Sequence, residues 1–320
     1  MDEIGEPAYR ATQVWEWLAR GEGSLDSMTN LPLALRQELA DRLPVSTLTV
    51  EQTATSDDGT VKALFETSDD RPVEAVLMRY RDGRRSVCLS SQSGCPLTCT
   101  FCATGSMKFG RNLTESEILD QALHFRRIEP INHVVFMGMG EPMMNLDNVL
   151  AACERLPDIG VANSKTTVST VGWLPGIERM AHEGPSVRLA LSLHAPEDGL
   201  RSEIMPVNDR YPIAALIEAC LEWRRARRRK VFIEYLMLEG VNDSPAQARQ
   251  LAELLGSDND FKVNLIPFNP SGSAYSGSSP EVIETFRRTL GGNGVFASVR
   301  LTRGRDIDAA CGQLAVRSAA

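Results

Sequence analysis

From residue 86 onward the chain alternates short apolar or β-branched runs with amphipathic stretches, and this alternation restricts the possible folds more than any other feature. Repeated strand and helix units of this length require parallel strands joined by right-handed crossovers. The sequence therefore predicts an α/β fold, a full or partial (β/α) barrel whose ligand sites lie at the carboxyl ends of its strands. The buried strands are expected at 86–89, 133–137, 166–169, 187–193, 231–237, 262–266 and 295–301.

Two shorter segments precede this predicted core. Residues 1–47 hold two amphipathic helical patterns, the second of which stops at Pro44, and they predict a small helical accessory domain. Residues 48–85 carry β-rich stretches separated by Asp-Gly turn signals, and they predict a β-rich linker segment. Residues 86–320 then form the core with its C-terminal extension.

Composition excludes several classes of protein. No run of 18 or more apolar residues occurs, and the first ten residues lack the basic and apolar regions of a signal peptide, so we expect a cytoplasmic protein without membrane contact. The 320 residues carry 34 Lys and Arg against 42 Asp and Glu, a net charge of -8. This balance excludes a protein that coats nucleic acid by overall attraction.

Cysteine spacing gives the most specific chemical signal. The seven cysteines are an odd number in a chain without an export signal, which speaks against a disulfide framework. Cys95, Cys99 and Cys102 lie close together directly after the first predicted core strand. Three thiolates can hold three irons of a [4Fe-4S] cluster and leave the fourth iron open to a ligand. A zinc site completed by a remote fourth ligand is the alternative.

The Cys-x3-Cys-x2-Cys spacing after the first strand of a (β/α) barrel resembles the radical S-adenosylmethionine (SAM) superfamily. Five separated motifs, in order along the chain, make the sequence similar to the RlmN/Cfr family of RNA adenosine methyltransferases. The resemblance extends from about residue 7 to the C-terminus and implies a partial barrel of the radical SAM type. The five motifs are Cys88-Leu-Ser-Ser-Gln-Ser-Gly-Cys95, Phe101-Cys-Ala-Thr-Gly105, Gly138-Met-Gly-Glu-Pro142, Ser192-Leu-His194 and Asp306-Ile-Asp-Ala-Ala-Cys-Gly-Gln-Leu314.

The resemblance implies two cofactors, a [4Fe-4S] cluster on the three motif cysteines and SAM on its open iron. Taken singly, the polar residues that follow the strands are better explained as strand-end caps or satisfied polar side chains, and only the resemblance selects them as SAM contacts. A turn from strand to helix with a capping carboxylate would also explain the segment around Glu141. The residues that the resemblance assigns to SAM binding are Gly140, Glu141, Ser169, Ser192, Leu193, His194 and Asn269.

The resemblance also assigns three catalytic residues. Cys311 becomes S-methylated, Cys88 later closes a disulfide with it, and Glu74 is the base that removes a proton from the substrate carbon. Without the resemblance, both cysteines would be interpreted as small buried residues and Glu74 as a solvent-facing strand carboxylate. Cys153 and Cys220 fall within amphipathic stretches and are expected in the core.

The implied reaction methylates carbon 2 of a specific adenosine in 23S ribosomal RNA, and it leaves open whether transfer RNA is also a substrate. One SAM methylates Cys311, and a second SAM is cleaved reductively to a radical that takes a hydrogen atom from this methyl group. The carbon radical adds to the ring, and the adduct loses an electron and a proton, the latter to Glu74. Attack of Cys88 on the sulfur of Cys311 releases the product, and the resulting disulfide must be reduced at each turnover.

RNA contacts have several candidates in the sequence. The run 224–230 holds six basic residues in seven positions, and Arg79, Arg81, Arg84 and Arg85 form a second group. Such runs neutralise phosphates, but they equally describe a solvated helix end. The segment 1–47 is another candidate, although its tryptophans are expected in its own core. Because the chain begins close to the first helical pattern, we expect a shortened segment that narrows RNA binding.

The expected partners are the RNA substrate and a low-potential electron donor such as flavodoxin or ferredoxin, and the chain is expected to act as a monomer. Two alternatives stay open. A Cfr-type enzyme would methylate carbon 8 of the same adenine, whereas Gly140-Glu-Pro142 and Asn269-Pro270 are more similar to the RlmN side and favour carbon 2. A non-enzymatic zinc or iron–sulfur RNA-binding protein would share the cysteines but would not cleave SAM.

Overall fold

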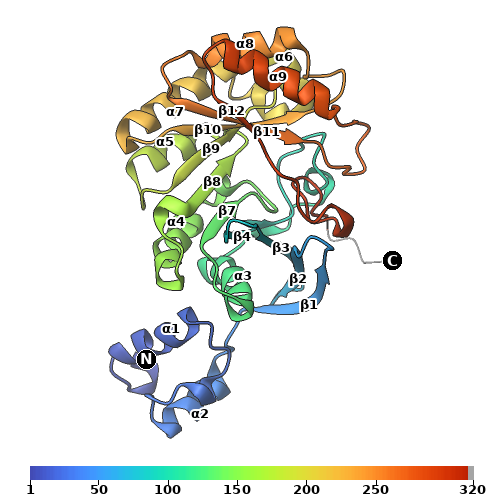
Figure 1. Ribbon diagram of the computed structural model, residues 1–320. Helices are drawn as coiled ribbons and strands as arrows, with labels where there is room; N and C mark the ends of the chain where they lie inside the picture. The colour runs from blue at the N-terminus through green and yellow to red at the C-terminus, as the bar shows by residue number, and fades with distance from the viewer. Residues whose placement is uncertain (316–320) are drawn as a thin grey trace.

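The computed structural model describes residues 1–315 of the chain (Figure 1). Within this range ten strands form one sheet in the order β1-β2-β3-β4-β7-β8-β9-β10-β11-β12. Strands β1 to β4 pair in antiparallel fashion, and β4 and β7 to β12 pair in parallel. The strands are β1 (Leu48–Thr55), β2 (Val61–Thr67), β3 (Pro72–Arg79), β4 (Arg85–Cys88), β7 (His133–Phe136), β8 (Thr166–Thr170), β9 (Arg188–Ser192), β10 (Val231–Met237), β11 (Phe261–Pro267) and β12 (Ala297–Val299).

Helices from α3 onward follow the parallel strands and cover the outer face of the curved sheet (Figure 1). A separate two-stranded sheet joins β5 (Gln92–Ser93) to β6 (Arg111–Asn112). The predicted α/β fold with a partial barrel is thereby confirmed, while residues 316–320 of the predicted core lie outside the described range. The helices are α1 (Tyr9–Ala19), α2 (Leu33–Arg42), α3 (Glu115–Ile128), α4 (Leu146–Arg155), α5 (Leu174–His182), α6 (Asp198–Ile204), α7 (Ile213–Arg227), α8 (Pro245–Leu255) and α9 (Pro280–Gly292).

The core lies between the outer face of the sheet and these helices. Along β7, Val134 and Phe136 are buried, whereas His133 and Val135 between them are only half-buried, because successive side chains of a strand point to opposite faces. Cys153 on α4 and Cys220 on α7 are fully buried in the same core, as predicted. Among the described helices, none combines the length and the apolar character needed to cross a bilayer.

The prediction for the last strand is wrong in its length and in its burial. The sequence predicts a buried strand over 295–301, but only Ala297–Val299 pairs, and it pairs with β11 alone. Val299 is 43% exposed and Leu301 is 63% exposed. An edge strand has a neighbour on one side only, so apolar residues along it do not become buried as they do in a central strand.

The N-terminal helices form a small cluster around Met28, Leu35 and Leu39. Trp17 packs against this cluster, as expected, but Trp15 packs against the core of the barrel. The indole Nε1 of Trp15 donates a hydrogen bond of 2.7 Å to Asp158, which lies between α4 and β8. Helices α1 and α2 therefore sit at the end of the barrel where its parallel strands begin, which we call the amino end (Figure 1). The opposite end is the carboxyl end.

Candidate active site

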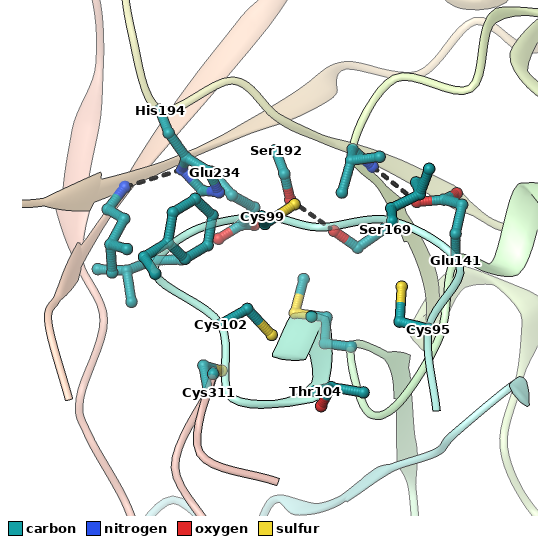
Figure 2. Close-up of a pocket in the computed structure, with 18 of the residues that line it drawn as sticks. Cys95, Cys99, Cys102, Thr104, Glu141, Ser169, Ser192, His194, Glu234 and Cys311 are labelled. Atoms are coloured by element: carbon teal, nitrogen blue, oxygen red, sulfur yellow. Dashed lines mark hydrogen bonds between the residues drawn. The ribbon is translucent and has the colours of Figure 1, made fainter. Parts of the chain in front are cut away.

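The three motif cysteines gather at the carboxyl end of the barrel, in the loop that follows β4 and β5. Cys95, Cys99 and Cys102 line one cavity, called here the motif cavity (Figure 2). The backbone N–H of Thr100 donates to the carbonyl of Ile204 at the end of α6, at 3.0 Å, and so attaches this loop to the barrel. Gly105 is required beside it, because a Cβ there would lie 2.9 Å from the carbonyl oxygen of Cys99.

The electrostatics of these thiols fit a bound cationic cluster. Burial raises the pKa of Cys95 to about 12 and also raises the pKa values of Cys99 and Cys102, and the neighbouring cysteines add to the shift. Buried thiols become thiolates when a metal supplies the opposite charge. Within residues 1–315, no three His, Cys, Asp or Glu side chains converge as the ligands of a single metal ion do. The three thiols that line the motif cavity match the donor set of a [4Fe-4S] cluster with one open iron.

A buried carboxylate faces the motif cavity from the loop after β7. Glu141 accepts hydrogen bonds from the backbone N–H groups of Met143, at 3.0 Å, and Val171, at 2.9 Å. Burial raises its pKa to about 7, although these hydrogen bonds lower it. The preceding Gly140 has a φ of 93° and lies so close to Gln92 that a Cβ would overlap it. A cationic group of a ligand would therefore stabilise the ionised form of this carboxylate.

A histidine with a fixed tautomer lies across the cavity, after β9. The Nδ1 atom of His194 accepts a hydrogen bond of 3.0 Å from the backbone N–H of Leu236. Burial, with the charge of Arg201, lowers the pKa of His194 to about 3, so the ring is neutral and carries its proton on Nε2. His194 has a φ of 60°, a left-handed conformation that a non-glycine residue adopts only where its surroundings enforce it.

Further polar groups at the strand ends point into the same cavity. The hydroxyls of Ser169 on β8 and Ser192 on β9 are 3.5 Å apart (Figure 2). Asn269 donates from Nδ2 to the carbonyl of Cys311, at 3.3 Å. Its Oδ1 atom is buried and accepts no hydrogen bond from the described part of the chain. A buried acceptor of this kind in a cavity wall indicates a ligand that donates to it.

A buried guanidinium, that of Arg201, lies behind these strand ends and was not predicted from the sequence. Arg201 on α6 is fully buried and donates to the carbonyls of Ser192, at 3.2 Å, and Leu193, at 3.1 Å, and also to that of Val171. It forms no ion pair with a carboxylate of residues 1–315. Arg201 thereby ties the ends of β8 and β9 together, and no local pattern marks such a tertiary role.

Cys311 lines the motif cavity and also a second cavity beside it, called here the side cavity. Cys88 lines the side cavity, and all seven cysteines are free thiols. Burial, with the neighbouring Cys311, raises the pKa of Cys88 to about 12. The two cavities share Met137, Ile266 and Asn269 as well as Cys311. One sulfur therefore faces both the motif cysteines and the thiol of Cys88.

The segment that carries Cys311, residues 304–315, is called here the C-terminal loop. It is hydrogen-bonded directly to residues 94–110, the loop between β5 and β6 that holds the three motif cysteines, called here the motif loop. The backbone N–H of Ala103 donates to the carbonyl of Gly312 at 2.9 Å, and the hydroxyl of Thr104 donates to the carbonyl of Leu314 at 2.6 Å. These bonds place the loop beside the three motif cysteines (Figure 2).

Glu74 does not face solvent, so the ordinary interpretation of its sequence position is wrong. It is 1% exposed, forms an ion pair of 3.0 Å with Lys62, and accepts a hydrogen bond of 3.0 Å from the backbone N–H of Ala315. Glu74 lines neither the motif cavity nor the side cavity. Leu193 also lines neither cavity and takes part through its backbone. The other predicted site residues all line one cavity or both.

Several side chains of the basic run 224–230 form ion pairs or hydrogen bonds with other residues of the protein. Arg224 forms an ion pair with Asp260, and Arg225 forms one of 2.7 Å with Glu218. Arg227 donates to the carbonyl of Met180 at the end of α5, at 2.9 Å. The run ends where β10 begins, so it lies at the amino end of the barrel, away from the motif cavity.

Comparisons with known proteins agree with this geometry. The chain matches the Radical SAM superfamily over residues 89–252 and the ribosomal RNA large subunit methyltransferase N-terminal domain over residues 1–45. It is 45% identical to the probable dual-specificity RNA methyltransferase RlmN of Thermus thermophilus, covering 99% of this chain and 91% of the relative. It is 44% identical to the dual-specificity RNA methyltransferase RlmN of Geobacter sulfurreducens, covering 97% and 87%.

Among solved structures, a radical SAM methyltransferase from Sphaerobacter thermophilus superposes with a TM-score of 0.92 at 43% identity. The superposition covers 98% of this chain and 94% of that protein.

Proposed function

Because the chain belongs to the RlmN family of radical SAM RNA methyltransferases, we propose that it methylates carbon 2 of an adenosine in 23S ribosomal RNA, with transfer RNA as a second substrate. The family expected from the five motifs is thereby confirmed. The observation that carries the proposal is the position of Cys311, which lines both the motif cavity and the cavity of Cys88. A thiol that receives a methyl group from SAM must lie beside the motif cavity. If it later bonds to a second thiol, it must also lie beside that thiol.

The enzyme uses a [4Fe-4S] cluster and SAM. Cys95, Cys99 and Cys102 would hold the cluster, which when bound supplies the electron that cleaves SAM reductively. In this proposal Glu141 accepts hydrogen bonds from the ammonium group of SAM, and the Nε2–H of His194 donates to an acceptor atom of the same ligand. The unpartnered Oδ1 of Asn269 accepts a hydrogen bond from the same ligand.

SAM affinity is expected to fall as the pH decreases below about 7. Burial raises the pKa of Glu141 to about 7, so its carboxyl group is neutral below that pH and no longer attracts an ammonium group. Calorimetry should show a Kd that rises about tenfold for each pH unit below this value. Glu141→Gln is expected to bind weakly at every pH, with a flat profile. An affinity of the unmodified enzyme that stays constant between pH 5.5 and 8 would contradict the assignment.

The two thiols of the side cavity divide the remaining chemistry. The sulfur of Cys311 carries the methyl group. Its carbon would give up one hydrogen atom to the radical that reductive cleavage of SAM supplies and then form a bond to carbon 2 of the adenine, after which the adduct loses one electron and the carbon-2 proton. The thiolate of Cys88 then attacks this sulfur, so that an S–S bond forms as the S–C bond breaks and the released carbon takes up a proton. Glu74 is proposed to accept the proton lost from carbon 2. Since its carboxylate contacts Lys62 and the C-terminal loop, that loop must shift before Glu74 can reach the ring.

Thr104 is expected to position Cys311 through its hydrogen bond to Leu314. Thr104→Val keeps the shape of the side chain but leaves the buried carbonyl without its donor, at a cost of about 1–3 kcal/mol. Alkylation of Cys311 by iodoacetamide, followed by peptide mass spectrometry, should become faster in this variant, and kcat should fall. Thr104→Ser retains the hydroxyl and should restore both. Equal alkylation rates in the Val and Ser variants would show that this bond does not hold the loop.

We further infer that a small low-potential protein, flavodoxin or ferredoxin, supplies the electron, and that the chain acts as a monomer in the cytoplasm, where its RNA substrates occur. The segment 1–47 is proposed as an RNA-binding accessory domain, 48–85 as the β-rich connection and 86–320 as the catalytic core.

Mass spectrometry of digested RNA tests the proposed function. Anaerobically prepared enzyme with its cluster, SAM and a reductant should convert adenosine in 23S ribosomal RNA and in transfer RNA to 2-methyladenosine. A product with the retention time of 8-methyladenosine would instead assign the Cfr-type reaction. Protein that neither cleaves SAM nor methylates RNA under these conditions would exclude the methyltransferase.

A further inference from the structure

The inner face of the barrel carries cations and an aromatic ring at its amino end. Ser192 on β9, Leu236 on β10 and Ile266 on β11 line the motif cavity at the carboxyl end. Side chains four positions apart on a strand share one face, so the residues four positions earlier face the same interior near the opposite end. These residues are Arg188 on β9, Phe232 on β10 and Lys262 on β11.

Contacts among these side chains interleave positive charge with aromatic rings. The guanidinium of Arg188 lies 5.8 Å from the centre of the Phe232 ring. The ammonium of Lys262 lies 5.8 Å from the same ring and 5.1 Å from that of Phe296, which is 60% exposed. Among the described residues, neither Arg188 nor Lys262 forms an ion pair with a carboxylate. Both cations are thus available to an anionic ligand.

A second group of the same kind lies in the turn between β3 and β4, also at the amino end. The guanidinium of Arg84 lies 3.9 Å from the centre of the Tyr80 ring, and that of Arg303 lies 5.3 Å from it. The Nε atoms of both arginines are buried and donate no hydrogen bond within residues 1–315. Acidic neighbours are few here: Asp82 lies 3.8 Å from Arg84, and Asp58 lies 3.6 Å from Arg303.

Tyr80 connects this group to the reactive thiols. It lines the side cavity together with Arg300 and Arg303, and the same cavity reaches Cys88 and Cys311. None of the residues lining the side cavity is acidic. Tyr80, Arg303 and Arg300, the last of which forms an ion pair of 3.3 Å with Glu234, therefore line the cavity that holds the two thiols, and Tyr80 joins this cavity to the group in the turn between β3 and β4.

Interleaved cations and aromatic rings match single-stranded RNA, since cations attract the phosphates while rings stack on the bases. The segment 1–47 docks at this same end through Trp15 and Asp158. Because the whole chain has a net charge of -8, attraction of RNA must come from a local patch of this kind.

Resting on the proposed function, we propose that the RNA substrate docks at the amino end of the barrel, opposite the motif loop, as a single-stranded loop. Arg188 and Lys262 contact backbone phosphates, and the target base passes Tyr80 into the side cavity to reach Cys311. The RNA thus approaches from one end while the motif cysteines occupy the other.

The decisive experiment compares two double variants of the cluster-loaded enzyme by their affinity for a fluorescent 23S ribosomal RNA fragment. Arg188→Gln/Lys262→Gln should raise the Kd about tenfold and reduce the salt slope of log Kd by about 1.4, or about 0.7 for each lost phosphate contact. Arg249→Gln/Arg288→Gln removes the same charge from the outer helices α8 and α9 and should leave both values unchanged. Thermal unfolding checks that both variants fold.

Two further variants test the path and its alternative. Tyr80→Leu should raise KM for RNA, and Tyr80→Phe, which keeps the ring, should restore it. Lys108 is exposed on the motif loop, so Lys108→Gln tests whether RNA docks at the carboxyl end instead. If Lys108→Gln weakens RNA binding and Arg188→Gln/Lys262→Gln does not, the docking proposal is overturned. Failure of the unmodified enzyme to methylate RNA would overturn the proposed function instead.

Discussion

Cys311→Ala is expected to abolish RNA methylation while the protein keeps its iron. Cys311 is the thiol that lines both cavities, and it is not one of the three motif cysteines. The carbonyl that accepts the hydrogen bond of Asn269 and the Cβ are both retained in alanine, so the C-terminal loop keeps its contacts. Since no other sulfur occupies this position, turnover should fall at least about 10³-fold.

The measurement is methyladenosine in RNA digests, with iron content and SAM binding determined on the same samples. Cys153→Ala is a matched control, because it removes a fully buried thiol of α4 that touches neither cavity. It should cost about 1 kcal/mol of stability and leave methylation in place. Cys99→Ala should lose both iron and activity. Retention of methylation by Cys311→Ala would show that the methyl group travels by another route.

Cys88→Ala is expected to accumulate a covalent link between protein and RNA. Once the methyl carbon on Cys311 is bonded to the adenine, release requires a thiolate that attacks the sulfur. Cys88 lines the same cavity as Cys311, and alanine in its place has no sulfur to attack with. The reaction should therefore stop after about one turnover, with RNA attached through a thioether.

Denaturing gels should show a band of reduced mobility that ribonuclease removes and that dithiothreitol leaves intact, because a thioether is not reducible. The double variant Cys88→Ala/Cys311→Ala should give no such band. Multiple turnovers of Cys88→Ala without an adduct would exclude Cys88 as the residue that resolves the intermediate.

The sequence predicted the fold because the relevant signals are local. Apolar and β-branched runs indicated the order and approximate bounds of the central strands, and amphipathic stretches correctly placed Cys153 and Cys220 in the core. The same signals failed at 295–301, since an apolar run does not show whether a strand lies at the edge of its sheet. Burial there depends on neighbours that are distant in sequence.

The candidate site was predicted as a set of residues, but its electrostatics depend on tertiary contacts. Glu74 is buried, and Lys62 and the backbone N–H of Ala315 compensate its charge. The role of Arg201 depends on carbonyls from two different strands. In the basic run, Arg227 donates to a carbonyl of another helix, whereas Arg188, which is isolated in the sequence, belongs to the half-buried group of cations and rings at the amino end. The sequence alone does not show which basic side chains already form ion pairs or hydrogen bonds within the fold.

The sharing of Cys311 between two cavities also sets the order of events. A sulfur bonded to Cys88 cannot carry a methyl group, so in the proposed reaction each round of methylation would wait until a reductant has opened the disulfide. In the proposed reaction, conditions that keep this disulfide closed would therefore halt RNA methylation until it is reduced.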